Sequence, residues 1–313
     1  DSATITAYLA KFIGTPGDKL HAFSLCRTEK EPGYILETSQ RSGIEHNYIR
    51  TAGSGSMEDG VRRLRSAIKI LGYPGEHGNG AGYVPFYKEC ELRGIRTLHS
   101  GYGGDEVVTN PGRQLRLELI DSKNFRAFWG LKQVKNPLRR VLSLGKIMAI
   151  GRENLEFPRY AEEAFNKGWS WQILNPDVAE KIGLYKTMRE RAKFDAPYRK
   201  INDWILNGLL KMPYVPTRLE DCTLMAAAYG IDYRWALWDV RLVQQYLSTP
   251  SIEKLGPNNM GRYLHRRAIV GTVPKKVAWK QNKEMGDHVG AETSRENFSK
   301  ELIQKCRAQL ADM

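Results

Sequence analysis

A glycine-rich bend that ends in two carboxylates carries the clearest chemistry in the sequence. Residues 99–106 read HSGYGGDE, and the acidic side chains are Asp105 and Glu106. Glycines let a backbone approach a ligand closely and adopt positive φ angles, and the N–H groups of such a bend can form an anion-binding nest. An aspartate beside the nest can hold Mg²⁺ against phosphate oxygens. The stretch therefore indicates a nucleotide with a metal, although an acidic cap on a following helix would explain it equally well.

Short strands and helices that alternate along the chain must position this bend. Apolar runs predict strands over residues 20–26, 45–51 and 95–100. Periodic or capped segments predict helices over residues 1–13, 34–43, 56–72 and 85–94, with a glycine-rich loop at 73–84. Such alternation predicts an α/β fold, with a parallel sheet and helices on both of its faces. The bend then lies at the carboxyl end of a strand, where ligands bind in open α/β folds.

The character of the sequence changes after residue 110. Helical periodicity dominates from about residue 113 to 248, and no segment there reads as a strand. We expect a mainly helical half that packs on the sheet. Residues 291–313 form a polar amphipathic segment, which we expect to be a helical tail.

Composition narrows the class of protein. The chain has 313 residues, of which 41% are hydrophobic and 27% are charged, as is usual for a globular protein. No apolar run approaches the roughly 18–20 residues that span a bilayer, so we expect no membrane partner. The four cysteines are far apart and form no CxxC pair. They predict reduced thiols in a cytoplasmic protein rather than a disulfide framework or a zinc site.

The charge balance favours polyanionic partners. The formal net charge is +13 and the sequence pI is about 9.5, which suits nucleotides, nucleic acid or an acidic carrier. The basic residues are spread over many segments, which is typical of a solvated surface, so we do not expect nucleic acid to be the main partner. A tRNA-modifying pyrophosphatase stays open as a rival, and it would require RNA binding with a steep salt dependence.

Four stretches, in order along the chain, resemble the synthetase domain of the asparagine synthetase family. The string SGYGGDE resembles the family's second nucleotide motif, and the opening DSATITAYLA resembles the end of its pyrophosphatase loop, SGGxDS, followed by a helix. Residues 219–250 resemble a stretch of the family that contains R-x-P-F-L-D-x-x-L-V. Residues 262–286 resemble the family's closing segment, R-x-A-x-x-G-x-x-P-x-x-V-x-x-R-x-x-K.

The resemblance implies a fold and a domain organisation. It implies an adenine-nucleotide α-hydrolase-like (HUP) fold over residues 1–290, divided into a nucleotide-binding α/β part (1–110) and a mainly helical part (111–290). The SGGx half of the phosphate loop would lie upstream of residue 1, so we expect ATP binding by this chain alone to be impaired. An upstream glutaminase-like domain, or a relative that has lost that activity, is implied for the parent protein.

The resemblance also implies an activity. Members of the family activate a carboxylate with ATP, release pyrophosphate and let an amine attack the acyl-adenylate. The implied cofactors are ATP and Mg²⁺, and the implied substrate is a small-molecule or peptide carboxylate. The cofactor-binding residues carried over from the family motifs are Asp1, Ser2, Ser100, Gly101 and Gly103. Asp1 and Asp105 would be the two metal carboxylates, and Glu106 would cap or orient the bend.

Tyr102 and Lys283 are the implied catalytic residues. Lys283, with Lys280 as the alternative, would neutralise charge on the phosphates or on the acyl oxygen. Tyr102 stands where asparagine synthetases usually carry Glu, and the β-lactam-forming branch has Tyr there, paired with a distant Glu as a base. A phenol with an ordinary pKa of about 10 needs such a partner; Glu153 and Glu156 are candidates by position alone. A Tyr102 that only fills the bend is the other interpretation.

Two further rival functions stay open besides the tRNA-modifying pyrophosphatase. One is an intramolecular amide synthetase of the macrocyclase or β-lactam type, which Tyr102 and the spacing of KQNK favour. The other is a degenerate, non-catalytic relative that binds nucleotide, against which the retained Asp1, Asp105 and Lys283 argue. Within the unusual stretch DYRWALWD, we expect Arg234 and Asp239 to form a buried ion pair.

Overall fold

The computed structural model divides the chain into two compact units. It describes residues 1–14, 17–26, 28–51, 56–73, 75, 79–112, 114–132, 136–150, 176–183, 198–211, 214–280 and 304. Of these, the residues within Asp1–Arg113 and Ile205–Ala291 form the first unit, and those within Gln114–Trp204 and Glu292–Met313 belong to the second. The predicted boundary between residues 110 and 111 stays a prediction.

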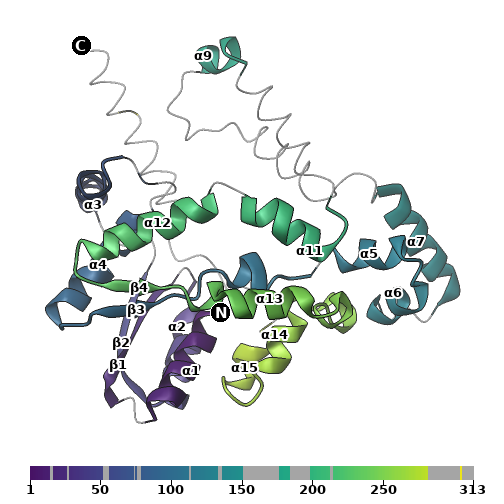
Figure 1. Cartoon of the computed structure of the whole chain (residues 1–313), viewed down its shortest axis with the longest axis horizontal. Coiled ribbons are helices and arrows are strands. Elements are labelled where there is room, and N and C mark those ends of the chain that lie inside the picture. Colours follow the sequence, from purple (N-terminus) through teal and green to yellow (C-terminus); the bar gives the residue numbers. More distant parts are fainter. Residues whose placement is uncertain are drawn as a thin grey trace. The chain divides into compact units, whose positions relative to one another are not determined.

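The first unit opens with a parallel β–α–β arrangement (Figure 1). Its elements are α1 (Ser2–Ile13), β1 (Gly17–Cys26), α2 (Glu31–Arg41) and β2 (Ile44–Thr51). The two strands are parallel, with His21 opposite His46 and Cys26 opposite Thr51. Helix α2 connects the strands and packs against both of them, as parallel neighbours require a crossover connection. The predicted strands over 20–26 and 45–51 are confirmed, as is the helix at the start of the chain.

Helix α3 (Met57–Leu71) has the ends that its sequence predicts. Ser56 is the N-cap, and its hydroxyl oxygen accepts a hydrogen bond from the backbone N–H of Asp59 at 3.2 Å. Gly72 ends the helix with φ 80°, the left-handed conformation that glycine adopts without a steric penalty. Both caps are local, which explains why the sequence alone predicts the bounds of this helix.

Helix α4 (Asn79–Leu92) begins six residues before the predicted start at residue 85, so the loop predicted over 73–84 is wrong in its second half. Pro85 lies inside the helix rather than in its first turn. The glycine-rich start becomes helical because it packs against α12 (Tyr214–Ala227). Tertiary packing, rather than propensity, supplies most of the stability of a helix in a protein.

Strands β3 (Thr97–His99) and β4 (Asp232–Arg234) form a second parallel pair. The prediction that no strand lies between 113 and 248 is therefore wrong. β4 has only three residues, too few to show an alternating pattern, and it forms because β3 lies beside it. Within the described residues the strands make two separate two-stranded sheets. The mixed α/β class and the parallel pairing are confirmed, whereas a single sheet of the HUP type stays a prediction.

Helices and single helical turns make up most of the remaining described chain. In the first unit they are η2 (Gly104–Val108), η4 (Leu209–Lys211), α12, η5 (Ala236–Trp238), α13 (Val240–Ser248), η6 (Ser251–Glu253), η7 (Pro257–Asn259), α14 (Tyr263–Ala268) and α15 (Lys275–Ala278). In the second unit they are α5 (Leu115–Asp121), α6 (Phe125–Lys132), α7 (Pro137–Ile150), α9 (Pro176–Lys181) and α11 (Ile201–Asp203). The turn η3 (Trp204–Gly208) leads from the second unit back into the first. The described elements of the second unit are all helical, as predicted.

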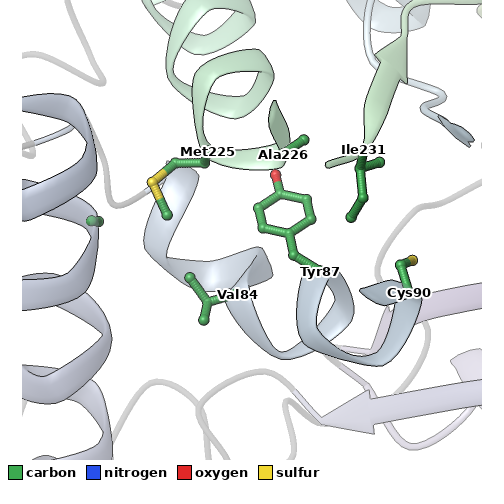
Figure 2. Packing of buried hydrophobic residues seen from close by; sticks show 7 residues of the cluster. Val84, Tyr87, Cys90, Met225, Ala226 and Ile231 are labelled. Carbon is green, nitrogen blue, oxygen red and sulfur yellow. The ribbon is translucent and has the colours of Figure 1, made fainter. Parts of the chain in front are cut away.

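The core of the first unit lies between α4 and α12 (Figure 2). The ring of Tyr87 points from α4 toward Met225 and Ala226 of α12, and Val84 and Cys90 flank it on its own helix. Tyr87 and Met225 are completely inaccessible to solvent. The Tyr87 hydroxyl donates a hydrogen bond to the backbone oxygen of Cys222 at 3.4 Å. This core fixes the helices that flank the second sheet.

The described cysteines are buried free thiols at positions 26, 90 and 222, while Cys306 lies outside the described residues. In the part of the chain that the structure describes, no helix combines the length and the apolar character needed to cross a bilayer. Residues 291–313, which we predict to be a helical tail, lie outside the description apart from residue 304.

Two glycines of α4 predict opposite effects of the same substitution. A Cβ atom at Gly82 would meet nothing within 4 Å, so Gly82→Ala should stabilise the protein by about 0.5–1 kcal/mol through helix propensity. A Cβ atom at Gly80 would lie 2.5 Å from Cγ of the buried Met225, so Gly80→Ala should destabilise by about 1–3 kcal/mol through overpacking. Urea unfolding of both variants measures the difference, and equal effects would contradict the packing of α4 on α12.

Candidate functional site

The glycine-rich bend after β3 lies against the beginning of the chain. A Cβ atom at Gly101 would lie 2.5 Å from the backbone N of Ser2, and a Cβ atom at Gly104 would lie 2.5 Å from Cγ of Asp1. Both positions therefore need glycine for a steric reason, because any side chain would displace the start of α1. The structure thus brings together the two segments that the resemblance assigns to one nucleotide site.

The two predicted metal carboxylates both interact with the guanidinium of Arg262. A side-chain oxygen of Asp1, Oδ1, accepts a hydrogen bond from the Thr109 hydroxyl at 2.7 Å. Its other oxygen, Oδ2, lies 3.7 Å from Nη1 of Arg262. Nη2 of the same guanidinium forms an ion pair with Oδ1 of Asp105. Sequence reasoning missed Arg262, although it stands inside the closing segment, because nothing distinguishes it there from the other basic residues.

Hydrogen bonds within the bend fix its shape. The Ser100 hydroxyl oxygen accepts from the backbone N–H of Tyr102 at 3.1 Å, and the Glu106 carboxylate accepts from the N–H of Gly103 at 3.1 Å. Gly103 has φ 97°, which favours glycine. Glu106 therefore closes the bend. Burial raises the pKa of its carboxyl, against the opposing effect of the backbone N–H groups that it accepts from.

Tyr102 lies in a cluster of aromatic rings. The Arg218 guanidinium stacks over its ring at 4.1 Å from the centroid, and the Trp235 and Trp238 rings lie 5.8 and 6.0 Å away. Burial raises the pKa of Tyr102, Glu106 raises it further, and Arg218 acts in the opposite direction. The phenol is therefore neutral near pH 7. Among the described residues, nothing accepts or donates a hydrogen bond at its buried hydroxyl.

The structure describes only one of the candidate partners of Tyr102 and candidate lysines. Glu153 and Glu156 lie outside the described residues, as does Lys283. Lys280 is described, and its ammonium group lies 4.8 Å from the ring centroid of Tyr34 on α2. The roles predicted for Tyr102 and Lys283 stay predictions.

Arg266 anchors the segment that carries Arg262. Its guanidinium donates hydrogen bonds to the backbone oxygens of Gly261, Ala278 and Lys280 at 2.9, 2.7 and 2.6 Å. It thereby ties the loop before α14 to the end of α15. The same side chain thus holds the chain at Lys280, the last described residue before Lys283.

The expected ion pair between Arg234 and Asp239 is wrong. Arg234 pairs with Asp232 at 2.7 Å, and Asp239 pairs with Arg241 at 2.7 Å. Asp239 also accepts from the backbone N–H of Arg241 and so caps α13. Each charge has taken a partner two residues away, where little chain entropy is lost, and most of these groups are substantially exposed.

His265 joins α14 to α1 and predicts a pH dependence. Its Nε2 lies 3.0 Å from the Thr4 hydroxyl oxygen. Burial, with neighbouring positive charges that include Arg262 and Arg266, lowers the pKa of His265 to about 3. The unfolded chain, with an ordinary histidine pKa near 6.5, binds more protons below that pH than the folded chain. Stability should therefore fall as the pH drops below about 6.5, by roughly 1 kcal/mol per pH unit from this group.

The substitution His265→Gln should flatten this dependence. Denaturant unfolding of both proteins between pH 6.5 and 4.5 measures the two slopes. Carboxylates elsewhere act alike in both proteins, so the difference between the slopes isolates His265. Parallel slopes would contradict a buried, neutral His265.

The donor set around Arg262 fits a hard divalent cation. Two carboxylates come from separate segments and already share one positive group. Mg²⁺ is usually bound by one or two protein carboxylates together with substrate phosphates, rather than by an all-protein cage. Among the described residues, no group of three or more His, Cys, Asp or Glu side chains is placed to hold a metal ion. A nucleotide would have to complete the coordination.

The fold and the site define a mixed α/β protein. In it, a glycine-rich bend after a parallel strand carries Asp105 and packs against Asp1. The chain matches the family model described as asparagine synthase over residues 1–312, and it belongs to the asparagine synthase family. The family implies a ligase-type enzyme that depends on ATP. No curated protein matches the chain.

Proposed function

We propose that the protein is an amide-forming ligase. It would use ATP to adenylate a small-molecule or peptide carboxylate, release pyrophosphate and present the acyl group to ammonia or an amine. The observation that carries the proposal is that Asp1 and Asp105 both lie beside the guanidinium of Arg262. These residues come from the two segments that resemble the family's nucleotide motifs, and the absence of a side chain at Gly104 leaves room for Asp1.

The chain's own residues would act by positioning charge. Bound Mg²⁺ would supply positive charge against the departing pyrophosphate, a charge effect that is often the largest in such reactions. Asp1 and Asp105 would hold the metal, with Thr109 orienting Asp1. Ser2 would contact phosphate, while Ser100, Gly101 and Gly103 would line the nucleotide. Lys283 would neutralise charge on the phosphates or the acyl oxygen.

Tyr102 bears on the choice between ligase types. An intramolecular amide synthetase would need Tyr102 as a base. Burial raises the pKa of Tyr102, however, and this opposes a phenolate base at neutral pH. We therefore favour attack by an external amine. Tyr102 would then line the site as an uncharged side chain and would not act as a base. An upstream glutaminase-like domain as the source of ammonia is part of the proposal.

Exchange of labelled pyrophosphate into ATP tests the proposal. The full-length protein is incubated with ATP, Mg²⁺ and a panel of amino acids, dicarboxylates and short peptides. Exchange that depends on one class of acid supports adenylation. Nucleotide binding without exchange for any acid would favour the non-catalytic relative, and product formation without added amine would favour an intramolecular synthetase.

A further inference from the structure

The side chain of Arg262 bridges the two carboxylates that the proposed function assigns to Mg²⁺. One guanidinium nitrogen pairs with Asp105, and the other lies 3.7 Å from Asp1. The side chains of Arg262, Asp1 and Asp105 are 24%, 18% and 35% exposed. Pairs that are partly shielded from water are screened less by salt than pairs on the open surface. Salt should therefore screen this arrangement less than an ion pair on the open surface.

The backbone presents Arg262 to this place. Arg262 has φ 62°, in the left-handed region that residues other than glycine rarely adopt. Strained backbone persists where the surrounding structure imposes it, and it concentrates at functional sites. Arg266 supplies that constraint by binding the oxygen of Gly261, and His265 contacts Thr4 on α1. The guanidinium is thus held beside the carboxylates by a segment anchored on both sides.

We propose that Arg262 is a tethered cation that competes with Mg²⁺ for Asp1 and Asp105. The inference rests on the proposed function. A metal ion that arrives alone must displace the guanidinium or share the carboxylates with it, and like charges at such distances repel strongly. A nucleotide brings enough negative charge to compensate both cations. The site consequently takes up metal together with nucleotide and resists free metal.

The binding of Mn²⁺ without nucleotide tests this competition. Electron paramagnetic resonance of Mn²⁺ gives its affinity for the full-length wild type, Arg262→Gln, Arg262→Lys and Arg267→Gln. Arg267 is the matched control, since it lies on α14 and pairs with Glu253 at an exposed position. We expect Arg262→Gln to bind Mn²⁺ roughly tenfold more tightly than wild type, and Arg267→Gln to match wild type.

The lysine variant covers the case in which Arg262→Gln does not fold. A single ammonium group lacks the two-pronged geometry that lets a guanidinium reach two carboxylates, so Arg262→Lys should bind Mn²⁺ more tightly than wild type, by a smaller factor. If the neutral variant folds and binds Mn²⁺ no better than Arg267→Gln, the competition is refuted. If only the lysine variant folds, equality with wild type refutes it.

A second titration with ATP present separates this inference from the proposed function. Suppose that Arg262→Gln leaves the affinity unchanged, while wild type binds Mn²⁺ with ATP and Asp105→Asn does not. The competition then fails and the metal–nucleotide site stands. Absence of ATP-dependent Mn²⁺ binding in the wild type would overturn both.

Discussion

Asp105→Asn is expected to lower ATP-dependent pyrophosphate release by about a thousandfold, equivalent to about 4 kcal/mol of transition-state stabilisation. Asparagine has nearly the same shape as aspartate but carries no charge, so it binds a hard cation poorly. The ion pair with Arg262 is also lost, yet the Asp105 side chain is 35% exposed, and the cost to stability should stay near 1 kcal/mol. Pyrophosphate release and thermal unfolding, measured on the same preparations, give the two effects.

Asp232→Asn is the matched control for this prediction. It removes the same charge from an exposed carboxylate that pairs with Arg234 at 2.7 Å, and it should leave pyrophosphate release within about twofold of wild type. An Asp105→Asn variant with wild-type activity would show that this carboxylate holds no metal. A variant that unfolds near room temperature would instead assign Asp105 a structural role.

Tyr87→Ala should destabilise the first unit by about 3–5 kcal/mol, as is typical when a fully buried aromatic ring is removed. The ring is completely inaccessible and fills the space between α4 and α12 (Figure 2). Tyr87→Phe keeps the ring and loses only the hydrogen bond to Cys222, so it should cost about 1 kcal/mol. Guanidinium unfolding followed by circular dichroism measures both variants.

An exposed tyrosine provides the comparison. Tyr8 on α1 is 47% exposed, and Tyr8→Ala should change stability by less than about 1 kcal/mol. If Tyr87→Ala cost no more than Tyr8→Ala, the core between α4 and α12 would not hold the unit together. A large cost for Tyr87→Phe would mean that the buried hydroxyl, rather than the ring, matters most.

Local features of the fold were predictable from the sequence, and contacts between distant segments were not. The ends of α3 are set by Ser56 and Gly72, each within one turn of the helix, and the helix predicted over 56–72 is confirmed. The early start of α4 depends on Met225, which lies far along the chain. β4 depends on β3 in the same way. In both cases the deciding partner was invisible to any short window of sequence.

In the candidate site, too, local motifs were predictable from the sequence and contacts between distant segments were not. Motif resemblance named Asp1 and Asp105, and the structure places them around one guanidinium. It could not single out Arg262, because the identity of a partner across the fold is a matter of geometry. The expected pairing of Arg234 with Asp239 failed for the same reason, since closer partners were available.

The pairing of β3 with β4 has a consequence for the co-translational folding of the protein. Synthesis delivers β3 and the bend first, whereas β4 and Arg262 emerge only after residues 114–204 of the second unit have been translated. Until then, β3 lacks its described partner strand, and Asp1 and Asp105 lack their ion-pair contacts with Arg262. Contacts between such distant segments slow folding, and unpaired strand edges invite aggregation. A nascent chain stalled before residue 232 would thus be a natural client for chaperones.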